Sequence, residues 1–181
     1  DTTFRSMYLG LSAFLDANTE RRELLLGQRP PRFDSSFDEA IAQAGDDFER
    51  VALKAQAARD YFLLVGPPGT GKTSRALRRM VEHFYATSSM QILLLAYTNR
   101  AVDEICQSLS SITSGIDYIR VGSELSCDVR FRGHLLENIL AECNSRREVN
   151  TRMTDCRVYV GTVASIAAKA ELFKLKRFDV A

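Results

Sequence analysis

The sequence lacks the cysteine and histidine patterns that define metal-stabilised and disulfide-stabilised proteins. Its four cysteines form no Cys-x-x-Cys pair, and neither of the two histidines stands at ligand spacing from them. A zinc site or a disulfide framework is therefore not expected. We interpret the cysteines as free thiols of a reducing compartment: Cys106, Cys127, Cys143 and Cys156.

Long apolar runs and a strong net charge are also missing. No run is long enough to span a bilayer, and no signal peptide is recognisable. The sequence thus predicts a soluble, cytoplasmic chain with no membrane partner. The formal net charge is +1, so no global field attracts nucleic acid, and any such binding needs a local patch.

The length of 181 residues suits one domain, or one domain with a helical appendage. We predict that residues 1–59 form such a helical segment and that it packs on the core of the following domain. Within the first 15 residues, apolar side chains recur every three or four positions, which predicts one buried helical stripe. The stripe consists of Phe4, Met7, Tyr8, Leu11, Phe14 and Leu15.

From residue 60 onward, short apolar runs alternate with helix-like stretches. The runs are residues 61–65, 92–96, 118–121, 157–160 and 178–181. Strands separated by helices predict an α/β protein, a three-layer α/β/α sandwich with a parallel sheet. This domain covers residues 60–181 and includes a largely helical insertion around residues 123–156.

Residues 66–73 read Gly-Pro-Pro-Gly-Thr-Gly-Lys-Thr and match the pattern Gly-x-x-x-x-Gly-Lys-[Ser/Thr]. They lie between the apolar run 61–65 and a helix-like run, the context in which this pattern cradles phosphate groups. Gly66, Gly69 and Gly71 let the backbone curl with its N–H groups inward, and the next helix presents its positive end to the same anion. The sequence therefore predicts a nucleoside triphosphate site.

Two side chains of this loop receive chemical roles. Lys72 can reach the β- and γ-phosphate oxygens, and the hydroxyl of Thr73 can ligate Mg²⁺, so both are candidate catalytic residues. The full candidate nucleotide-binding set is Gly66, Pro67, Pro68, Gly69, Thr70, Gly71, Lys72, Thr73 and Ser74.

Residues 94–103, Leu-Leu-Ala-Tyr-Thr-Asn-Arg-Ala-Val-Asp, resemble motif Ia of superfamily 1 helicases. The resemblance is to the 5′-to-3′ branch that includes RNA-surveillance and replication-associated helicases, in which this turn touches the nucleic-acid backbone. Thr98 and Asn99 stand where a strand ends and a helix begins, so a hydroxyl, an amide and exposed N–H groups can face one phosphate. Simple helix capping by these residues is the alternative, and the two roles are compatible.

Residues 159–166, Tyr-Val-Gly-Thr-Val-Ala-Ser-Ile, resemble motif Ic of the same family. In that motif, short hydroxyls at the end of a strand face the nucleic acid. The two resemblances together imply nucleic-acid contacts from Thr98, Asn99, Arg100, Thr162 and Ser165.

The resemblance covers about residues 60–181 and implies an AAA-type P-loop NTPase with a RecA-like fold. Residues 178–181 resemble the strand before motif II, whose acidic pair holds Mg²⁺ and activates water, and the sequence stops before that box. The chain therefore looks like the N-terminal part of the first RecA-like domain of a longer helicase. Such a helicase uses ATP and Mg²⁺, binds single-stranded DNA or RNA, and works with a second RecA-like domain. We expect this piece to bind ATP and to hydrolyse very little.

Two other functions stay open at this point. A ring-forming protein-remodelling ATPase shares the wording of the loop, although residues 98–103 argue against it. A non-catalytic P-loop module is the third possibility. Adenine specificity is expected only from the family resemblance. Gln56 lies closer to the loop than the family's adenine-reading glutamine, and we interpret it as a helix-surface residue.

Overall fold

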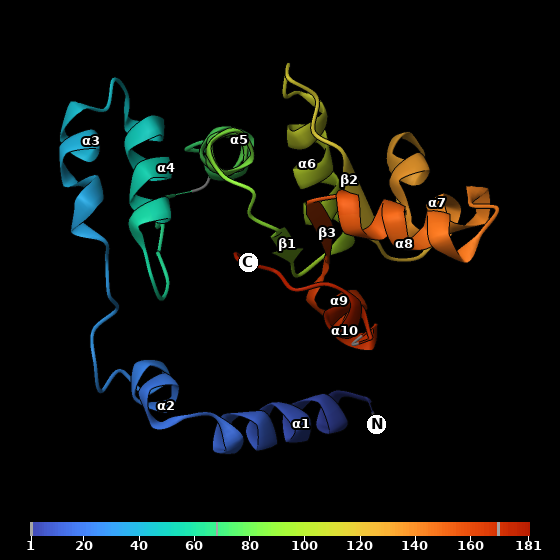
Figure 1. Cartoon of the computed structure of the whole chain (residues 1–181), viewed down its shortest axis with the longest axis horizontal. Coiled ribbons are helices and arrows are strands. Elements are labelled where there is room, and N and C mark those ends of the chain that lie inside the picture. The colour runs from blue at the N-terminus through green and yellow to red at the C-terminus, as the bar shows by residue number, and fades with distance from the viewer. Residues whose placement is uncertain (1, 68, 170) are drawn as a thin grey trace.

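A parallel three-stranded sheet forms the centre of the computed structural model, which describes residues 2–67, 69–169 and 171–181 (Figure 1). The strands are β1 (Ile92–Ala96), β2 (Tyr118–Val121) and β3 (Val158–Thr162), in the spatial order β1-β3-β2. The central strand β3 pairs in parallel with both neighbours, with Val160 opposite Leu94 on one side and Arg120 on the other. These strands are largely apolar because helices cover both faces of the sheet.

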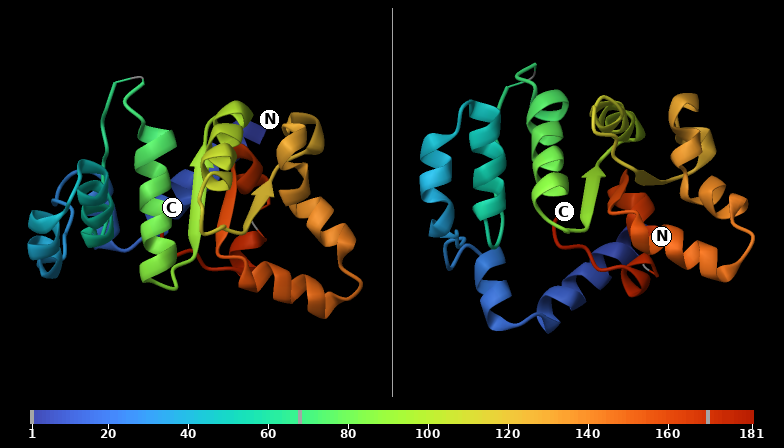
Figure 2. Two further views of the ribbon diagram at one scale, coloured as in Figure 1. Left: turned by 90° about the horizontal axis from the view of Figure 1, so that it is seen from above. Right: turned by 45° about the horizontal axis from the view of Figure 1, so that its top comes forward.

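The helices form one layer on each face of the sheet (Figure 2). On one face lie α5 (Arg78–Thr87) and α6 (Asn99–Ser110), packed on Leu94 and Val160. The opposite core contains Leu93 and Tyr159, because successive strand residues point to opposite faces. It is covered by α7 (Leu136–Glu142), α8 (Arg146–Asp155), α9 (Val163–Ala168) and α10 (Leu172–Leu175). The predicted three-layer α/β/α sandwich with a parallel sheet is confirmed.

The predicted strand at residues 61–65 is wrong, since the structure has an irregular segment there in which Val65 is 92% exposed. The free edge of β1 is occupied instead by the C-terminal segment, where the Leu93 N–H donates to the carbonyl oxygen of Val180 at 2.9 Å. A strand needs a neighbour for its N–H and C=O groups. Within the described ranges, residues 61–65 have no such neighbour, and the predicted strand at 178–181 is reduced to one bridge at Val180.

The N-terminal region contains several helices, and the last of them packs against α5. It contains α1 (Thr2–Asp16), α2 (Thr19–Leu25), the 3-10 turn η1 (Ser35–Phe37), α3 (Asp38–Gln43) and α4 (Asp47–Ala57). Helix α4 lies against α5, where Gln56 is hydrogen-bonded to His83. Gln56 thus joins two helices. The guanidinium of Arg75 stands 4.5 Å from the ring centroid of Phe48.

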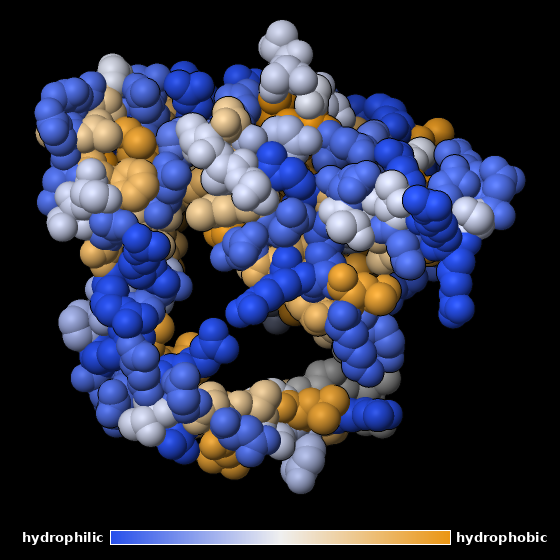
Figure 3. All heavy atoms as spheres, viewed as in Figure 1, coloured by the Kyte–Doolittle hydropathy of each residue, from blue (hydrophilic) through white to orange (hydrophobic). Residues whose placement is uncertain are grey.

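The apolar stripe of α1 is exposed, so the prediction that it is buried is wrong. Phe4 is 71% exposed, and Met7, Tyr8, Leu11 and Leu15 are exposed as well. Helix α1 extends along the lower edge of the molecule with apolar side chains on its surface (Figures 1 and 3). Periodicity identifies the apolar face of a helix but not what covers it. Neither α1 nor any other helix in the described ranges is long and apolar enough to cross a membrane.

Asp60 connects the segment before η1 to the end of α4. Its carboxylate accepts hydrogen bonds from Arg29 Nη1 at 2.8 Å and from Arg32 Nη2 at 2.9 Å, and from the Arg32 backbone N–H at 2.8 Å. Donation by Arg29, and then by Arg32, holds the pKa of Asp60 well below its usual range. This cluster holds the segment between α2 and η1 against the end of α4.

All four cysteines lie in the described ranges and are free thiols, as predicted. Cys106, Cys127 and Cys156 are buried. Burial raises the pKa of Cys106 and of Cys156 to about 11, so these thiols are protonated and unreactive at neutral pH.

Gly161 in β3 provides a test of this packing. A Cβ at this position would lie 2.9 Å from the carbonyl oxygen of Val121 and 3.1 Å from Cγ1 of Ile166. We expect Gly161→Ala to lower the free energy of unfolding by about 2 kcal/mol through overpacking, measured by chemical denaturation. Gly122→Ala is the matched control, because a Cβ at Gly122 would meet no atom within 4 Å beyond its two chain neighbours. Equal effects of the two substitutions would contradict the packing described.

Candidate nucleotide-binding site

The glycines of residues 66–73 serve two different needs. Gly69 and Gly71 both have φ of 81°, in the left-handed region that other residues seldom adopt. Gly66 instead permits a close approach, since a Cβ there would lie 2.9 Å from Oγ1 of Thr70. Pro68, which the sequence also assigns to this site, lies outside the described residues.

The loop is closed by its own side chains. The ammonium group of Lys72 donates to the carbonyl oxygen of Pro67 at 2.6 Å and to that of Gly66. The hydroxyl of Thr70 donates to the same Pro67 oxygen at 2.8 Å. A cation held only by carbonyl oxygens can exchange them for more strongly charged phosphate oxygens.

The helix after the loop begins with a π-helical turn, η2 (Lys72–Leu77), and continues as α5. The Ala76 N–H donates to the carbonyl oxygen of Gly71 at 3.0 Å, five residues back. At the start of any helix the first N–H groups have no partner within the helix, and the dipole there is positive. Thr73 and Ser74 lie in this first turn, so their backbone N–H groups and hydroxyls can receive an anion or its counter-ion.

A cavity of about 760 Å³ opens beside the loop. One wall contains Lys72 and Thr73, and the other consists of α6 and the connection that follows β2. The residues of the second wall are Arg100, Asp103, Glu104, Gln107, Ser108, Asp128 and Arg130. Sequence reasoning did not identify Gln107, Asp128 or Arg130 as site residues, because they belong to no motif and only the fold brings them to the loop.

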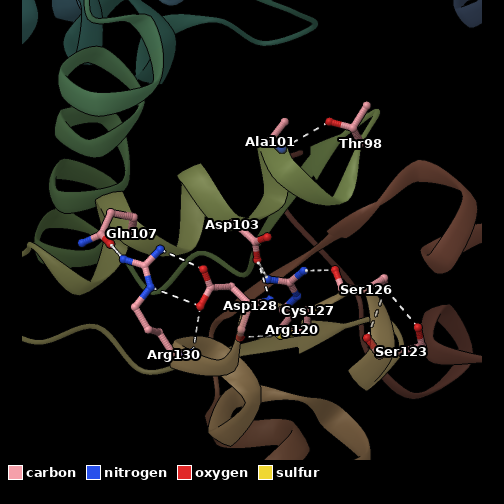
Figure 4. A network of polar contacts seen from close by, with 10 residues as sticks. All are labelled: Thr98, Ala101, Asp103, Gln107, Arg120, Ser123, Ser126, Cys127, Asp128 and Arg130. Carbon is pink, nitrogen blue, oxygen red and sulfur yellow. Dashed lines mark hydrogen bonds and ion pairs between the residues drawn. The ribbon is translucent and has the colours of Figure 1, made fainter.

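An ion pair with a buried arginine holds the second wall in place (Figure 4). Arg120 in β2 is 1% exposed and pairs with Asp103 of α6, while its Nη2 donates to the carbonyl oxygen of Ser126 at 3.3 Å. The backbone N–H of Asp128 also donates to Asp103, at 3.4 Å. Asp103 therefore connects helix α6 both to the sheet and to the connection after β2.

The residues that resemble motif Ia lie at the carboxyl end of β1. Thr98 caps α6, since its Oγ1 accepts a hydrogen bond from the Ala101 N–H at 3.2 Å, and Asn99 is the first helical residue. The side chain of Arg100 is 92% exposed and lies 3.8 Å from Glu104. Tyr97, which sequence reasoning missed, is 94% exposed between the strand and the helix. The sequence signal that could have identified Tyr97 is an aromatic residue within residues 94–103, directly after the apolar run.

The residues that resemble motif Ic lie next to them. Ala96 of β1 is opposite Thr162 of β3, so the two strand ends are side by side at the carboxyl edge of the sheet. Thr162 is buried, and its Oγ1 accepts a hydrogen bond from the Ser165 N–H at 3.0 Å and bonds to the Ser165 hydroxyl at 2.8 Å. Thr162 thus caps α9, whereas Tyr97 and Arg100 face solvent.

The layered parallel sheet and the glycine-rich loop that opens a helix define a P-loop nucleoside triphosphatase of RecA-like fold. The family model described as "AAA domain" matches residues 43–174, and the chain belongs to this family. The predicted resemblance to superfamily 1 helicases is confirmed by the relatives that follow.

The relatives carry helicase names. The chain is 30% identical to the DNA replication ATP-dependent helicase/nuclease JHS1 of Arabidopsis thaliana, over 99% of this chain and 14% of that protein. It is 33% identical to the human DNA replication ATP-dependent helicase/nuclease DNA2, over 56% of this chain and 10% of that protein. The putative ATP-dependent RNA helicase ECM32 of Saccharomyces cerevisiae is 32% identical, over 56% of this chain and 9% of that protein. The chain thus spans a small part of these relatives.

The Arg120–Asp103 pair generates a stability prediction. Arg120→Met leaves the partly exposed Asp103 carboxylate without its buried partner, and we expect the free energy of unfolding to fall by about 2 kcal/mol in chemical denaturation. Arg132→Met is the matched control, because Arg132 pairs at 2.8 Å with a Glu124 carboxylate whose side chain is 58% exposed. Removal of such a surface pair costs less than about 1 kcal/mol. A loss of similar size in both variants would show that the Arg120–Asp103 pair does not hold the second wall of the cavity in place.

Proposed function

We propose that the chain is the nucleotide-binding part of an ATP-dependent helicase, which couples ATP hydrolysis to movement along single-stranded DNA or RNA. The observation that carries this proposal is a shared helix. Helix α6 lines the cavity beside Lys72 and Thr73, and the same helix begins at Asn99, next to the exposed Tyr97, Thr98 and Arg100. A nucleotide at one place and a nucleic-acid strand at the other would both contact one rigid element.

The loop fits a Mg²⁺-bound triphosphate. Lys72 exchanges the carbonyl oxygens of residues 66 and 67 for β- and γ-phosphate oxygens, and the backbone N–H groups of residues 69–74 surround the phosphates. Thr73 would hold the Mg²⁺ of a bound Mg²⁺–nucleotide through its hydroxyl. The described residues contain no group of three or more His, Cys, Asp or Glu that could hold a metal ion by itself. The ion would offset the negative charge of the phosphates.

The carboxyl edge of β1 and β3 is the proposed nucleic-acid contact. Arg100 pairs with a phosphate group, and Thr98 and Asn99 offer backbone and side-chain hydrogen-bonding groups. Tyr97 offers an aromatic ring on which a base can stack. Thr162 and Ser165 hold the neighbouring turn in shape through their mutual hydrogen bond. Such contacts accept DNA or RNA, in keeping with relatives named for DNA replication and for RNA.

The proposal includes a division of the chain. Residues 1–59 are a helical segment attached through α4 and Asp60, and residues 60–181 are the RecA-like nucleotide domain, with a helical insertion at about 123–156. A second RecA-like domain is the expected partner across the cavity, since arginine residues supplied from a partner domain are worth ~10³–10⁵ in rate in such enzymes. The four free thiols support an intracellular, reducing location for the protein.

Nucleotide binding is tested with Lys72→Ala. We expect the dissociation constant for a Mg²⁺–ATP analogue to rise by about 10- to 100-fold, because a charge-assisted contact to phosphate is lost. Isothermal titration calorimetry measures it, and the exposed Lys54 of α4 provides the control Lys54→Ala. Equal affinity of the wild type and Lys72→Ala would remove the basis of the proposal. Nucleotide-dependent hexamers with no response to nucleic acid would favour a ring-forming ATPase instead.

Nucleic-acid binding is tested with Tyr97→Ala and Arg100→Ala. In fluorescence anisotropy with a single-stranded oligonucleotide, Tyr97→Ala loses stacking worth about 1–3 kcal/mol. Arg100→Ala lowers the slope of log affinity against log salt by about one unit. The control is Arg146→Ala, an exposed arginine of α8. If all three variants bind as the wild type does, the strand is held elsewhere.

A further inference from the structure

Arg130 belongs to the connection after β2 and lines the same cavity as Lys72 and Thr73. It lies in the 3-10 turn η4 (Val129–His134), which Asp128 caps by accepting the Arg130 backbone N–H at 3.0 Å. No motif marks this arginine. Its place beside the phosphate loop follows only from the packing of the connection on α6.

The guanidinium of Arg130 is held in one orientation. Nε donates to Oδ1 of Asp128 at 3.1 Å, Nη2 donates to Oδ2 of Asp128 at 2.9 Å, and Nη1 donates to Oε1 of Gln107 at 2.7 Å. A guanidinium has five N–H donors, and within the described part of the chain these contacts use three of them. Two donors are thus left for a ligand on a side chain that is still 63% exposed.

The carboxylate that orients Arg130 is itself anchored. The Asp128 backbone N–H donates to Asp103, which pairs with the buried Arg120, so Arg130 is connected to both α6 and β2 (Figure 4). Donation by the Arg130 side chain, and by its backbone N–H, lowers the pKa of Asp128 to about 2. Asp128 is therefore ionised at neutral pH and keeps its hold on the guanidinium.

The charges that line the cavity favour Arg130 as a partner for an anion. Arg100 is solvent-exposed and loosely paired with Glu104 at 3.8 Å, so ordering it costs side-chain entropy. Arg130 is already ordered, and a planar guanidinium matches the geometry of phosphate oxygens. Lys72 and Arg130 are thus the two ordered cations of the cavity, one on each wall.

We propose that Arg130 is a second cationic residue of the nucleotide site, which binds the phosphate chain of a nucleoside triphosphate from the α6 wall while Lys72 binds it from the loop. Asp128 and Gln107 are positioning residues for its guanidinium. The inference rests on the proposed binding of nucleotide at residues 66–73.

The test is isothermal titration calorimetry of the 181-residue chain with a non-hydrolysable Mg²⁺–ATP analogue. We expect Arg130→Gln to raise the dissociation constant about tenfold, the size expected for one charge-assisted hydrogen bond to phosphate. Arg132→Gln is the matched control, an arginine of the same turn that pairs with Glu124. Equal constants for the two variants would overturn the role of Arg130.

Asp128→Asn separates binding from a structural effect. An amide oxygen still caps η4, but the guanidinium of Arg130 loses one of its two charged acceptor oxygens. Nucleotide affinity should therefore fall, by less than it does in Arg130→Gln, which removes the charge itself. A loss larger than that of Arg130→Gln would mean that Asp128 acts by holding the turn and not by orienting Arg130, and it would sink the inference. If Arg130→Gln lowers the melting temperature, Arg130→Lys, which keeps the charge, should recover part of the affinity, and no recovery counts against a phosphate contact.

Lys72→Ala distinguishes this inference from the proposed function. If Lys72→Ala abolishes binding while Arg130→Gln does not weaken it, the nucleotide site stands and Arg130 is not part of it. If Lys72→Ala binds as the wild type does, the proposed nucleotide site fails, and the inference fails with it.

Discussion

The ion pair between Arg120 and Asp103 is the interaction on which the arrangement of the site depends. It places a cation inside a parallel sheet, where burial is costly unless a carboxylate and further acceptors satisfy the guanidinium. Asp103 meets this need from α6, the helix that also begins at the strand-end residues 97–100. Because the same carboxylate accepts the Asp128 N–H, a displacement of α6 relative to β2 would disturb three segments together.

In the phosphate loop, the position of the Lys72 side chain depends on carbonyl groups of the loop's own backbone. Lys72, the first residue of η2, donates hydrogen bonds to the carbonyl oxygens of residues 66 and 67. With this cation already beside the loop, the proposed binding of a nucleotide would exchange one set of oxygen partners for another. Such an exchange costs less than ordering an extended lysine.

Sequence reasoning succeeded where local chemistry decides. Three strands, the helices between them and the left-handed glycines at 69 and 71 follow from apolar runs and from the loop pattern. It failed where a distant neighbour decides. Residues 61–65 have the composition of a buried strand, yet a strand forms only beside a partner, and Val180 occupies the edge of β1. The stripe of α1 likewise identifies an apolar face without identifying a surface to cover it.

The α/β class, the phosphate loop and the two strand-end motifs can be read from the chain alone, because each depends on residues that are adjacent in it. That Gln107, Asp128 and Arg130 face this loop across one cavity follows only from the folded arrangement. These residues are far from residues 66–73 in the chain, and only the packing of α6 and the order β1-β3-β2 bring them there. Such contacts depend on how elements that are distant in the sequence pack against one another, and no local sequence pattern specifies that packing.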